Sequence, residues 1–149
     1  MRLILQRVAS AQVDVNGEPV GRIDRGVLVL VGCERGDDSQ VVRRAVDKLA
    51  GLRLFEDDSG RMNRSTLEIG GSFLVVSQFT LLASLERGRR PSFDRAAPAE
   101  EAEPLVEAVV EGLRARGFTV ATGRFRTHMR VSLVNDGPVT FVLDLPPES

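Results

Sequence analysis

The side chains best suited to chemistry in this sequence lie in one run of four, Ser77-Gln78-Phe79-Thr80. They follow the apolar run Phe73-Leu74-Val75-Val76, so the pattern turns polar where a strand is expected to leave the core. The Ser and Thr hydroxyls can attack a carbonyl or donate hydrogen bonds, and the Gln amide can orient one. A hydroxyl nucleophile also needs a base, and none lies nearby in the sequence. A strand that simply merges into a loop is the alternative interpretation.

The scarcity of His and Cys limits the chemistry further. The chain has one of each, His128 and Cys33. A zinc site built from Cys and His needs several such ligands, so we expect a protein that works without metal, cofactor or histidine triad. Cys33 follows the apolar run Val27–Val31 and is interpreted as a buried structural thiol. His128 lies in an alternating, strand-like stretch, where a surface or pocket-rim position is favoured over a catalytic base.

A second polar segment near the end of the chain reads Asn135-Asp136-Gly137-Pro138-Val139-Thr140. Proline cannot donate to a sheet ladder, so Pro138 is expected at the first residue of a strand. Asp136-Gly137 is typical of a tight turn. The residues therefore predict two strands, 129–134 and 139–145, joined by this turn.

Arginine is the third notable feature, because Lys48 is the only lysine. Arginines gather at two places, in a polar loop (Arg87, Arg89, Arg90 and Arg95) and around His128 (Arg124, Arg126 and Arg130). The planar guanidinium suits phosphate oxygens, and such patches bind RNA in a salt-dependent way. A genome-wide preference for arginine explains the Arg-to-Lys ratio well but the clustering less well. Phosphate binding by the 87–95 loop and a compositional bias both stay open.

The elements expected to position these residues begin with strands over 2–15, 20–23 and 26–33, the first two joined by the hairpin turn Asn16-Gly17. A helix follows, for which Asp37-Asp38-Ser39 offers caps and Gly51 a plausible stop. After it come a short strand over 52–55 and a strand over 72–79. The second helix covers 99–116, where Pro104 implies either a start nearer residue 103 or a bend. A strand over 118–122 precedes the last two.

Two helices cannot cover both faces of so many strands. We therefore predict an α/β domain spanning 1–149, with a curled or double-layered sheet and both helices on one side. The apolar fraction of 42% is sufficient for a continuous core. A net charge of −1 argues against a wholly basic nucleic-acid-binding surface, although it leaves a local patch possible.

The chain is expected to be soluble and cytoplasmic, with no membrane partner. Residues 1–15 lack the basic-then-apolar order of a signal peptide. The longest apolar run, Val27–Val31, is far shorter than the roughly 20 residues that span a bilayer. One cysteine cannot form an internal disulfide, which agrees with a reducing compartment.

Four spaced motifs resemble those of the D-aminoacyl-tRNA deacylases, formerly called D-tyrosyl-tRNA deacylases. These motifs are Gln6-Arg7-Val8, Ser77-Gln78-Phe79-Thr80-Leu81, Arg90-Pro91-Ser92-Phe93 and Val134-Asn135-Asp136-Gly137-Pro138-Val139-Thr140. The resemblance runs in order from Met1 to about Leu145. It implies a three-layer α/β/β sandwich and a cytoplasmic homodimer that hydrolyses the ester between tRNA and a D-amino acid or glycine, including glycine mischarged on tRNA-Ala.

The resemblance also implies roles for individual residues. Ser77, Gln78, Phe79 and Thr80 would be the catalytic segment, and a cis Gly137-Pro138 bond would enter the partner's site to exclude L side chains. The remaining residues would bind substrate: Arg7 would brace the Gly-Pro turn, Phe125 and Met129 would hold the terminal adenosine, and Asn135 would complete the set. With no histidine triad, backbone N–H groups near Phe79 and Thr80 would stabilise the oxyanion, and the 2′-hydroxyl of the tRNA would assist attack.

The chain departs from the family at one place. Small residues usually follow the phenylalanine that corresponds to Phe125, whereas Arg126-Thr127-His128 follows it here. These bulkier groups either alter the adenosine pocket or point outward and add a phosphate contact. Two other functions stay open, a non-catalytic RNA-binding module and an enzyme that cleaves other esters or amides.

Overall fold

Three antiparallel strands open the computed structural model, which describes residues 1–147. The long β1 (Arg2–Val15) pairs with β3 (Gly26–Gly32) through its first half and with β2 (Glu18–Ile23) through its second. Asn16 and Gly17 adopt φ angles of 51° and 79°, as a two-residue hairpin turn requires. The predicted hairpin is confirmed.

Helix α1 (Ser39–Gly51) starts within the predicted run of caps, with Asp38 as its N-cap, and ends at the predicted stop, Gly51. Asp38 Oδ1 accepts hydrogen bonds from the backbone N–H groups of Gln40 and Val41, at 3.0 and 3.2 Å. These bonds satisfy two of the donors that every helix leaves unpaired in its first turn. The apolar side chains of α1 recur at helical spacing and are buried: Val41, Val42, Ala45, Val46 and Leu49.

The segment after α1 differs in part from the prediction. β4 (Phe55–Glu56) begins at Phe55 and pairs with β5 (Met62–Arg64) in a small separate sheet. The strand predicted over 52–55 is therefore wrong in its bounds, because the Leu54 carbonyl accepts a hydrogen bond from Arg7 rather than from a neighbouring strand.

β6 (Ser72–Ser77) pairs with β3 in parallel and ends two residues before its predicted end. The chain turns there into a short 3₁₀ helix, η1 (Phe79–Leu82). Helix α2 (Ala99–Ala115) includes Pro104 in its second turn, so the later start near residue 103 is wrong. Proline leaves the Glu100 carbonyl without its helical donor, and Glu100 is exposed to water that can replace it. β7 (Val120–Thr122) then joins β6 in parallel.

The last two predicted strands are one strand, β8 (Arg130–Asp144). It pairs antiparallel with β1 from Asp14↔Arg130 to Arg2↔Asp144. Residues 136–139 have no register partner and lie opposite Arg7, so Asp136-Gly137 belongs to a bulge and the predicted tight turn is wrong. The reason is that β1 is long enough to pair with the residues on both sides of the bulge, so these form one strand.

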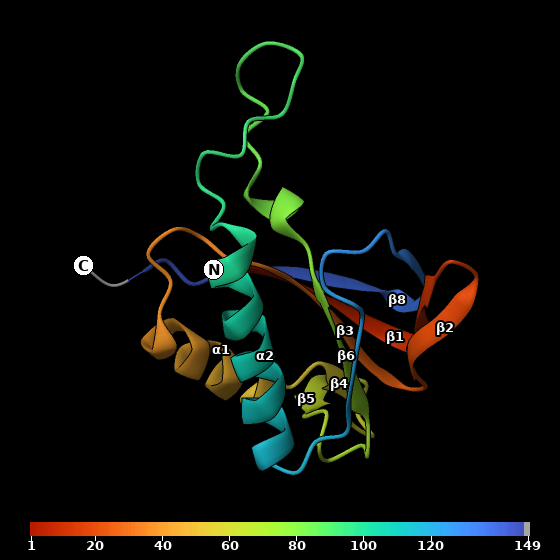
Figure 1. Cartoon of the computed structure of the whole chain (residues 1–149). Helices are drawn as coiled ribbons and strands as arrows, with labels where there is room; N and C mark the ends of the chain where they lie inside the picture. The colour runs from red at the N-terminus through yellow and green to blue at the C-terminus, as the bar shows by residue number, and fades with distance from the viewer. Residues whose placement is uncertain (148–149) are drawn as a thin grey trace.

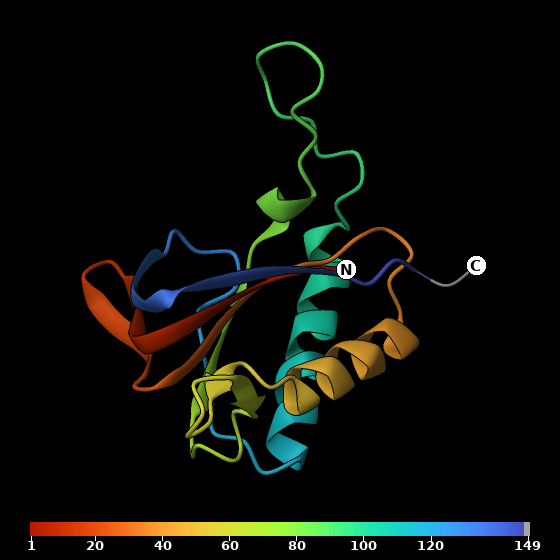
Figure 2. The same cartoon turned by 180° about the vertical axis from the view of Figure 1, so that it is seen from behind.

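The main sheet runs β2-β1-β3-β6-β7, with β8 on the other edge of β1, and it curls until β2 contacts β7. Neighbouring residues point to opposite faces of each strand. Val29 and Phe73 pack with the helices in one core, whereas Leu28 and Leu74 pack inside the curl in a second core. Both helices lie on one side of the sheet (Figures 1 and 2). The predicted three-layer α/β/β arrangement is confirmed.

Residues 83–98, here called the arm, connect η1 to α2 and rise away from the rest of the molecule (Figures 1 and 2). Within residues 1–147, no helix has the combined length and apolar character needed to cross a membrane.

Candidate active site

The Ser77–Thr80 segment lies where β6 leaves the sheet. The Gln78 backbone N–H still donates to the Val31 carbonyl at 2.8 Å, and the chain then turns into η1. This turn brings the Gln78 Nε2 group to 3.1 Å from Thr80 Oγ1, to which it donates a hydrogen bond. Phe79 is 56% exposed and packs against Phe93 of the arm, with ring centroids 5.2 Å apart. The polar end of β6 is thus held at the surface.

This segment forms one wall of a cavity of about 450 Å³. The first turn of α2 and the loop after β7 form the other walls. The lining residues are Cys33, Ser77, Gln78, Phe79, Thr80, Ala97, Ala99, Ala102, Phe125, Arg126, Thr127 and Met129. Six of the residues expected to form the site therefore come together, although 45 positions separate the two segments in the sequence.

Two backbone N–H groups in this wall are free. The N–H groups of Phe79 and Thr80 stand at the start of η1, where a helix has no internal acceptor for them. Neither makes a hydrogen bond to another group of residues 1–147. They are available to a ligand oxygen in the cavity.

Cys33 lies in the cavity wall but is 3% exposed. Its Sγ lies 3.8 Å from the Ala102 carbonyl oxygen, to which the thiol donates. Burial, and secondarily the charge of Asp37, raise the pKa of the Cys33 thiol to about 12. A thiol with this pKa stays protonated near neutral pH and is a poor nucleophile. The interpretation of Cys33 as a buried thiol is confirmed.

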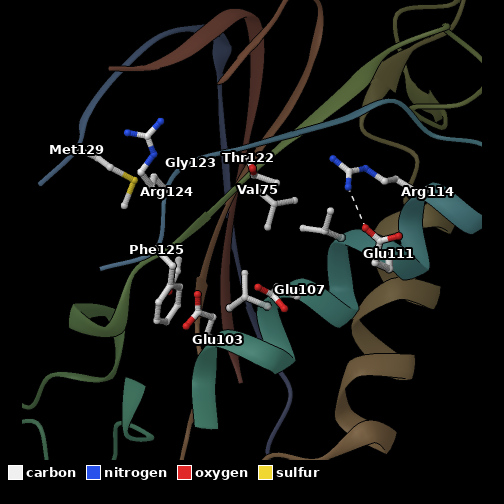
Figure 3. A pocket seen from close by; sticks show the side chains of 13 residues that line it. Val75, Glu103, Glu107, Glu111, Arg114, Thr122, Gly123, Arg124, Phe125 and Met129 are labelled. Atoms are coloured by element: carbon white, nitrogen blue, oxygen red, sulfur yellow. Dashed lines mark hydrogen bonds and ion pairs between the residues drawn. The ribbon is translucent and has the colours of Figure 1, made fainter. Parts of the chain in front are cut away.

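A second cavity, of about 470 Å³, adjoins the first and shares Ser77, Phe125 and Met129 with it. Figure 3 shows Phe125 and Met129 on one side of this second cavity and the carboxylates of α2 on the other. Those carboxylates belong to Glu103, Glu107 and Glu111, spaced one turn apart, and Glu111 accepts a 2.9 Å hydrogen bond from Arg114. This acidic wall is not among the sites expected from the sequence, although the three glutamates are visibly spaced four residues apart.

The remaining expected site residues form a second cluster around the β8 bulge. Arg7 is 8% exposed, and its Nε donates to the Asp136 carbonyl at 2.9 Å while Nη1 donates to the Leu54 carbonyl at 2.9 Å. Asn135 Oδ1 accepts from the Val139 N–H at 2.7 Å, and Asn135 Nδ2 donates to Thr140 Oγ1 at 2.8 Å. These bonds hold both sides of the bulge.

The tip of the bulge is the Gly137-Pro138 pair, whose peptide bond is cis. Gly137 has a φ angle of +149°, and a Cβ there would lie 2.7 Å from Val139 Cγ2. Glycine is therefore the residue that fits this backbone.

The two clusters do not meet within one chain. Neither Gly137 nor Pro138 lines the cavity that contains Thr80. Arg2 Nη1 donates to the Leu81 carbonyl at 3.2 Å, which places η1 near the start of β1. Arg7 lies five residues further along, or about 16 Å at 3.3 Å per residue. The sequence could not show this separation, because it depends on how β8 pairs with β1.

His128 is exposed and lines neither of the two cavities. The surface position favoured for it is confirmed. Arg126 does line the first cavity, adopts a φ angle of +59° and lies 3.6 Å from a Glu100 carboxylate oxygen. Among residues 1–147, no three or more His, Cys, Asp and Glu side chains are grouped so that they could hold a metal ion.

Comparison with known proteins assigns this arrangement to a family. The family model described as D-Tyr-tRNA(Tyr) deacylase matches residues 4–144. Over 144 residues the chain is 57% identical to the D-aminoacyl-tRNA deacylase of Thermomicrobium roseum, covering 97% of this chain and 94% of that protein. It is 56% identical to the protein of the same name from Symbiobacterium thermophilum, covering 97% and 95%.

A solved structure titled c-Myc DNA Unwinding Element Binding Protein has the same fold, with a TM-score of 0.92 and 38% identity. The similarity covers 98% of this chain and 99% of that one. Fold, site and relatives together define a hydrolase that acts on ester bonds. The chain belongs to the D-Tyr-tRNA(Tyr) deacylase family.

Proposed function

We propose that this protein hydrolyses the ester between the 3′ end of tRNA and a D-amino acid or glycine, releasing free tRNA in the cytoplasm. The cavity that joins the Ser77–Thr80 segment to Phe125 and Met129 carries this proposal. Half-buried Phe125 and Met129 offer an apolar wall on which the terminal adenine stacks. The relatives named as D-aminoacyl-tRNA deacylases support the substrate class.

The free N–H groups of Phe79 and Thr80 are the proposed oxyanion donors. Water adds to the ester carbonyl carbon, and the negative charge that develops on the carbonyl oxygen is stabilised by these two donors. The bond between the carbonyl carbon and the ribose 3′-oxygen then breaks, and the departing 3′-oxygen takes a proton. The neighbouring 2′-hydroxyl of the tRNA relays the proton from the water, so no side-chain base is required.

One substitution and one altered substrate test this mechanism. In Thr80→Ala the backbone N–H stays in place, so turnover is expected to fall less than tenfold, which corresponds to about 1.4 kcal/mol. A D-aminoacyl-tRNA whose terminal adenosine lacks the 2′-hydroxyl is expected to be turned over far more slowly. Abolition of turnover by Thr80→Ala, with folding and tRNA binding intact, would show that the Thr80 hydroxyl takes part in the reaction and would overturn the substrate-assisted step.

Discrimination against L-amino acids is proposed to come from the Gly137-Pro138 tip of a second copy. Backbone carbonyls at this tip would occupy the space that an L side chain needs, while a D side chain or glycine would not meet them. Arg7 and Asn135 already hold the bulge on both sides. The separation of bulge and cavity within one chain is the reason that a second copy is invoked.

The surface of β8 supports a homodimer. One edge of β8 pairs with β1, and the other edge pairs with no strand among residues 1–147. Val134, Phe141 and Val142 on this strand are exposed by 57%, 42% and 63%. A long open edge with exposed apolar side chains is a favourable surface for a second copy of the chain.

Val142→Asp tests the dimer, with Leu67→Asp as the matched control because Leu67 is 55% exposed outside β8. Sedimentation is expected to show a dimer for the wild type and the control, and a monomer for Val142→Asp. Deacylation should be lost with the dimer. A Val142→Asp monomer that still discriminates D from L would refute the shared site.

Deacylation of D-aminoacyl-tRNA, glycyl-tRNA and L-aminoacyl-tRNA under identical conditions tests the activity itself. Turnover of the D and glycyl substrates alone is expected. Binding without turnover would identify an RNA-binding module instead. Equal turnover of the L substrate would refute the proposed discrimination by the Gly137-Pro138 tip.

A further inference from the structure

Backbone hydrogen bonds and a ring contact attach the base of the arm to the site. Ser84 and Ser92 exchange backbone hydrogen bonds of 2.7 and 2.9 Å across the arm. The Phe79–Phe93 ring contact joins the same part of the arm to η1. Residues 85–91, here called the arm tip, thus project from a hydrogen-bonded stem.

The arginines of the base and of the tip differ in their partners. At the base, Arg95 Nε donates to Glu34 at 3.1 Å, and Arg35 Nε donates to the Asp94 carbonyl at 3.0 Å. At the tip, three arginines are exposed and make no ion pair or side-chain hydrogen bond with the described part of the chain: Arg87, Arg89 and Arg90. A bias toward arginine in the genome accounts for the Arg-to-Lys ratio, but accounts less well for three unpaired cations on one short loop.

Both ends of the arm also border the first cavity. One end of the arm follows η1, and at the other end Ala97 lines the cavity itself. On the α2 side, the adjoining second cavity presents three carboxylates and two arginines, of which Arg114 is paired with Glu111: Glu103, Glu107, Glu111, Arg114 and Arg124. The excess of carboxylates on that side makes it less favourable for a polyanion than the arm, so a polyanion whose end occupies the first cavity is drawn toward the arm.

We propose that the arm tip binds backbone phosphates of the tRNA substrate, several nucleotides from the ester. This inference rests on the proposed function for the identity of the RNA. Arg87, Arg89 and Arg90 act as cations on phosphate oxygens and read no sequence, so they add affinity for every tRNA alike. The adenosine and the amino acid are recognised separately in the cavity.

Binding of uncharged tRNA tests the proposal without requiring catalysis. Arg89→Gln/Arg90→Gln is compared with Arg43→Gln/Arg61→Gln, which removes the same charge from two exposed arginines outside the arm. Loss of two phosphate contacts reduces the slope of log Kd against log salt by about 1.4 to 1.8. Between 50 and 200 mM salt, the wild type and control should therefore lose roughly seven- to twelvefold more affinity than the arm variant.

Turnover provides the second readout, with D-aminoacyl-tRNA and D-aminoacyl-adenosine as substrates. The adenosine ester has no distant phosphates. The arm variant is expected to raise KM for the tRNA substrate at unchanged kcat, and to cleave the adenosine ester as the wild type does.

Three results would overturn the proposal. The first is an arm variant whose tRNA affinity and salt slope match those of the control pair. The second is an equal loss of turnover on both substrates, and the third is a change of oligomeric state, which would make the arm a protein contact. If the wild type binds tRNA with the expected slope but cleaves neither substrate, the proposed activity fails and the arm proposal stands.

Discussion

Arg7→Met removes the two hydrogen bonds that tie the β8 bulge to the segment before β4. Arg7 Nε and Nη1 each donate over 2.9 Å, to the carbonyls of Asp136 and Leu54, and Arg7 is 8% exposed. Methionine keeps the length and apolar stem of the side chain but offers no donor. Both carbonyls are then left without this partner.

The size of the effect follows from these two bonds. A hydrogen bond from a charged donor contributes about 1.5–3 kcal/mol, and the guanidinium no longer has to be buried in the variant, which offsets part of the loss. We expect the free energy of unfolding to fall by about 3 kcal/mol. For a chain of this length, that lowers Tm by roughly 6–12 °C.

Urea unfolding at one fixed protein concentration measures the change, with Arg7→Lys and Arg43→Met as controls. A lysine ammonium can replace one of the bonds, so Arg7→Lys should lose about half as much, and the exposed Arg43 should lose almost nothing. The ratio of D to L deacylation should also fall roughly tenfold in Arg7→Met, equivalent to 1.4 kcal/mol of lost discrimination. Stability within about 0.5 kcal/mol of the wild type would show that Arg7 does not hold the bulge.

Three further changes test other parts of the structure. Gly32→Ala places a Cβ against Leu82 Cδ2, 2.9 Å from Leu81 Cβ and 3.1 Å from the Gln78 carbonyl oxygen, so η1 must shift. Deacylation is expected to fall at least about tenfold in this variant, because η1 carries the Phe79 and Thr80 N–H groups. Leu113→Ala leaves a cavity at a fully buried position and should cost about 2–5 kcal/mol in urea unfolding, with kcat unchanged. The pKa of Cys33 is about 12 in the fold against an ordinary value of 9.0, so its contribution to stability is present below pH 9 and is lost as the pH rises toward 12. Between pH 9 and 12, the free energy of unfolding of Cys33→Ala should therefore fall less steeply with pH than that of the wild type, by up to about 1.4 kcal/mol per pH unit. Identical slopes for the two proteins would contradict the effect of burial on the Cys33 thiol.

Local patterns predicted most of the elements. Asn16-Gly17 supplies the positive φ angles of a hairpin turn, and Asp38 caps α1 with its own side chain. Both effects depend on a few neighbouring residues, so they are visible in the sequence. The bounds of β4 and the continuity of β8 depend on distant partners, Arg7 and the whole of β1, so local pattern placed both incorrectly.

For the site, the sequence by itself determined the chemistry that is available. The sequence contains hydroxyls, an amide and glycine at defined positions, but only one histidine and one cysteine. These residue types and their numbers are the same whatever the fold. The motifs around Ser77–Thr80 and Gly137-Pro138 also identified the family, which the comparisons confirm.

Only the tertiary structure decided how these groups are divided in space. It brought Thr80 to Phe125 in one cavity, left the Phe79 and Thr80 N–H groups free, and placed Gly137 on a bulge opposite Arg7, near the middle of β1. It also separated the paired arginines at the base of the arm from the unpaired ones at its tip. The physical reason is that burial, free donors and charge partners depend on contacts between segments that are far apart in the chain, and no local pattern encodes those contacts.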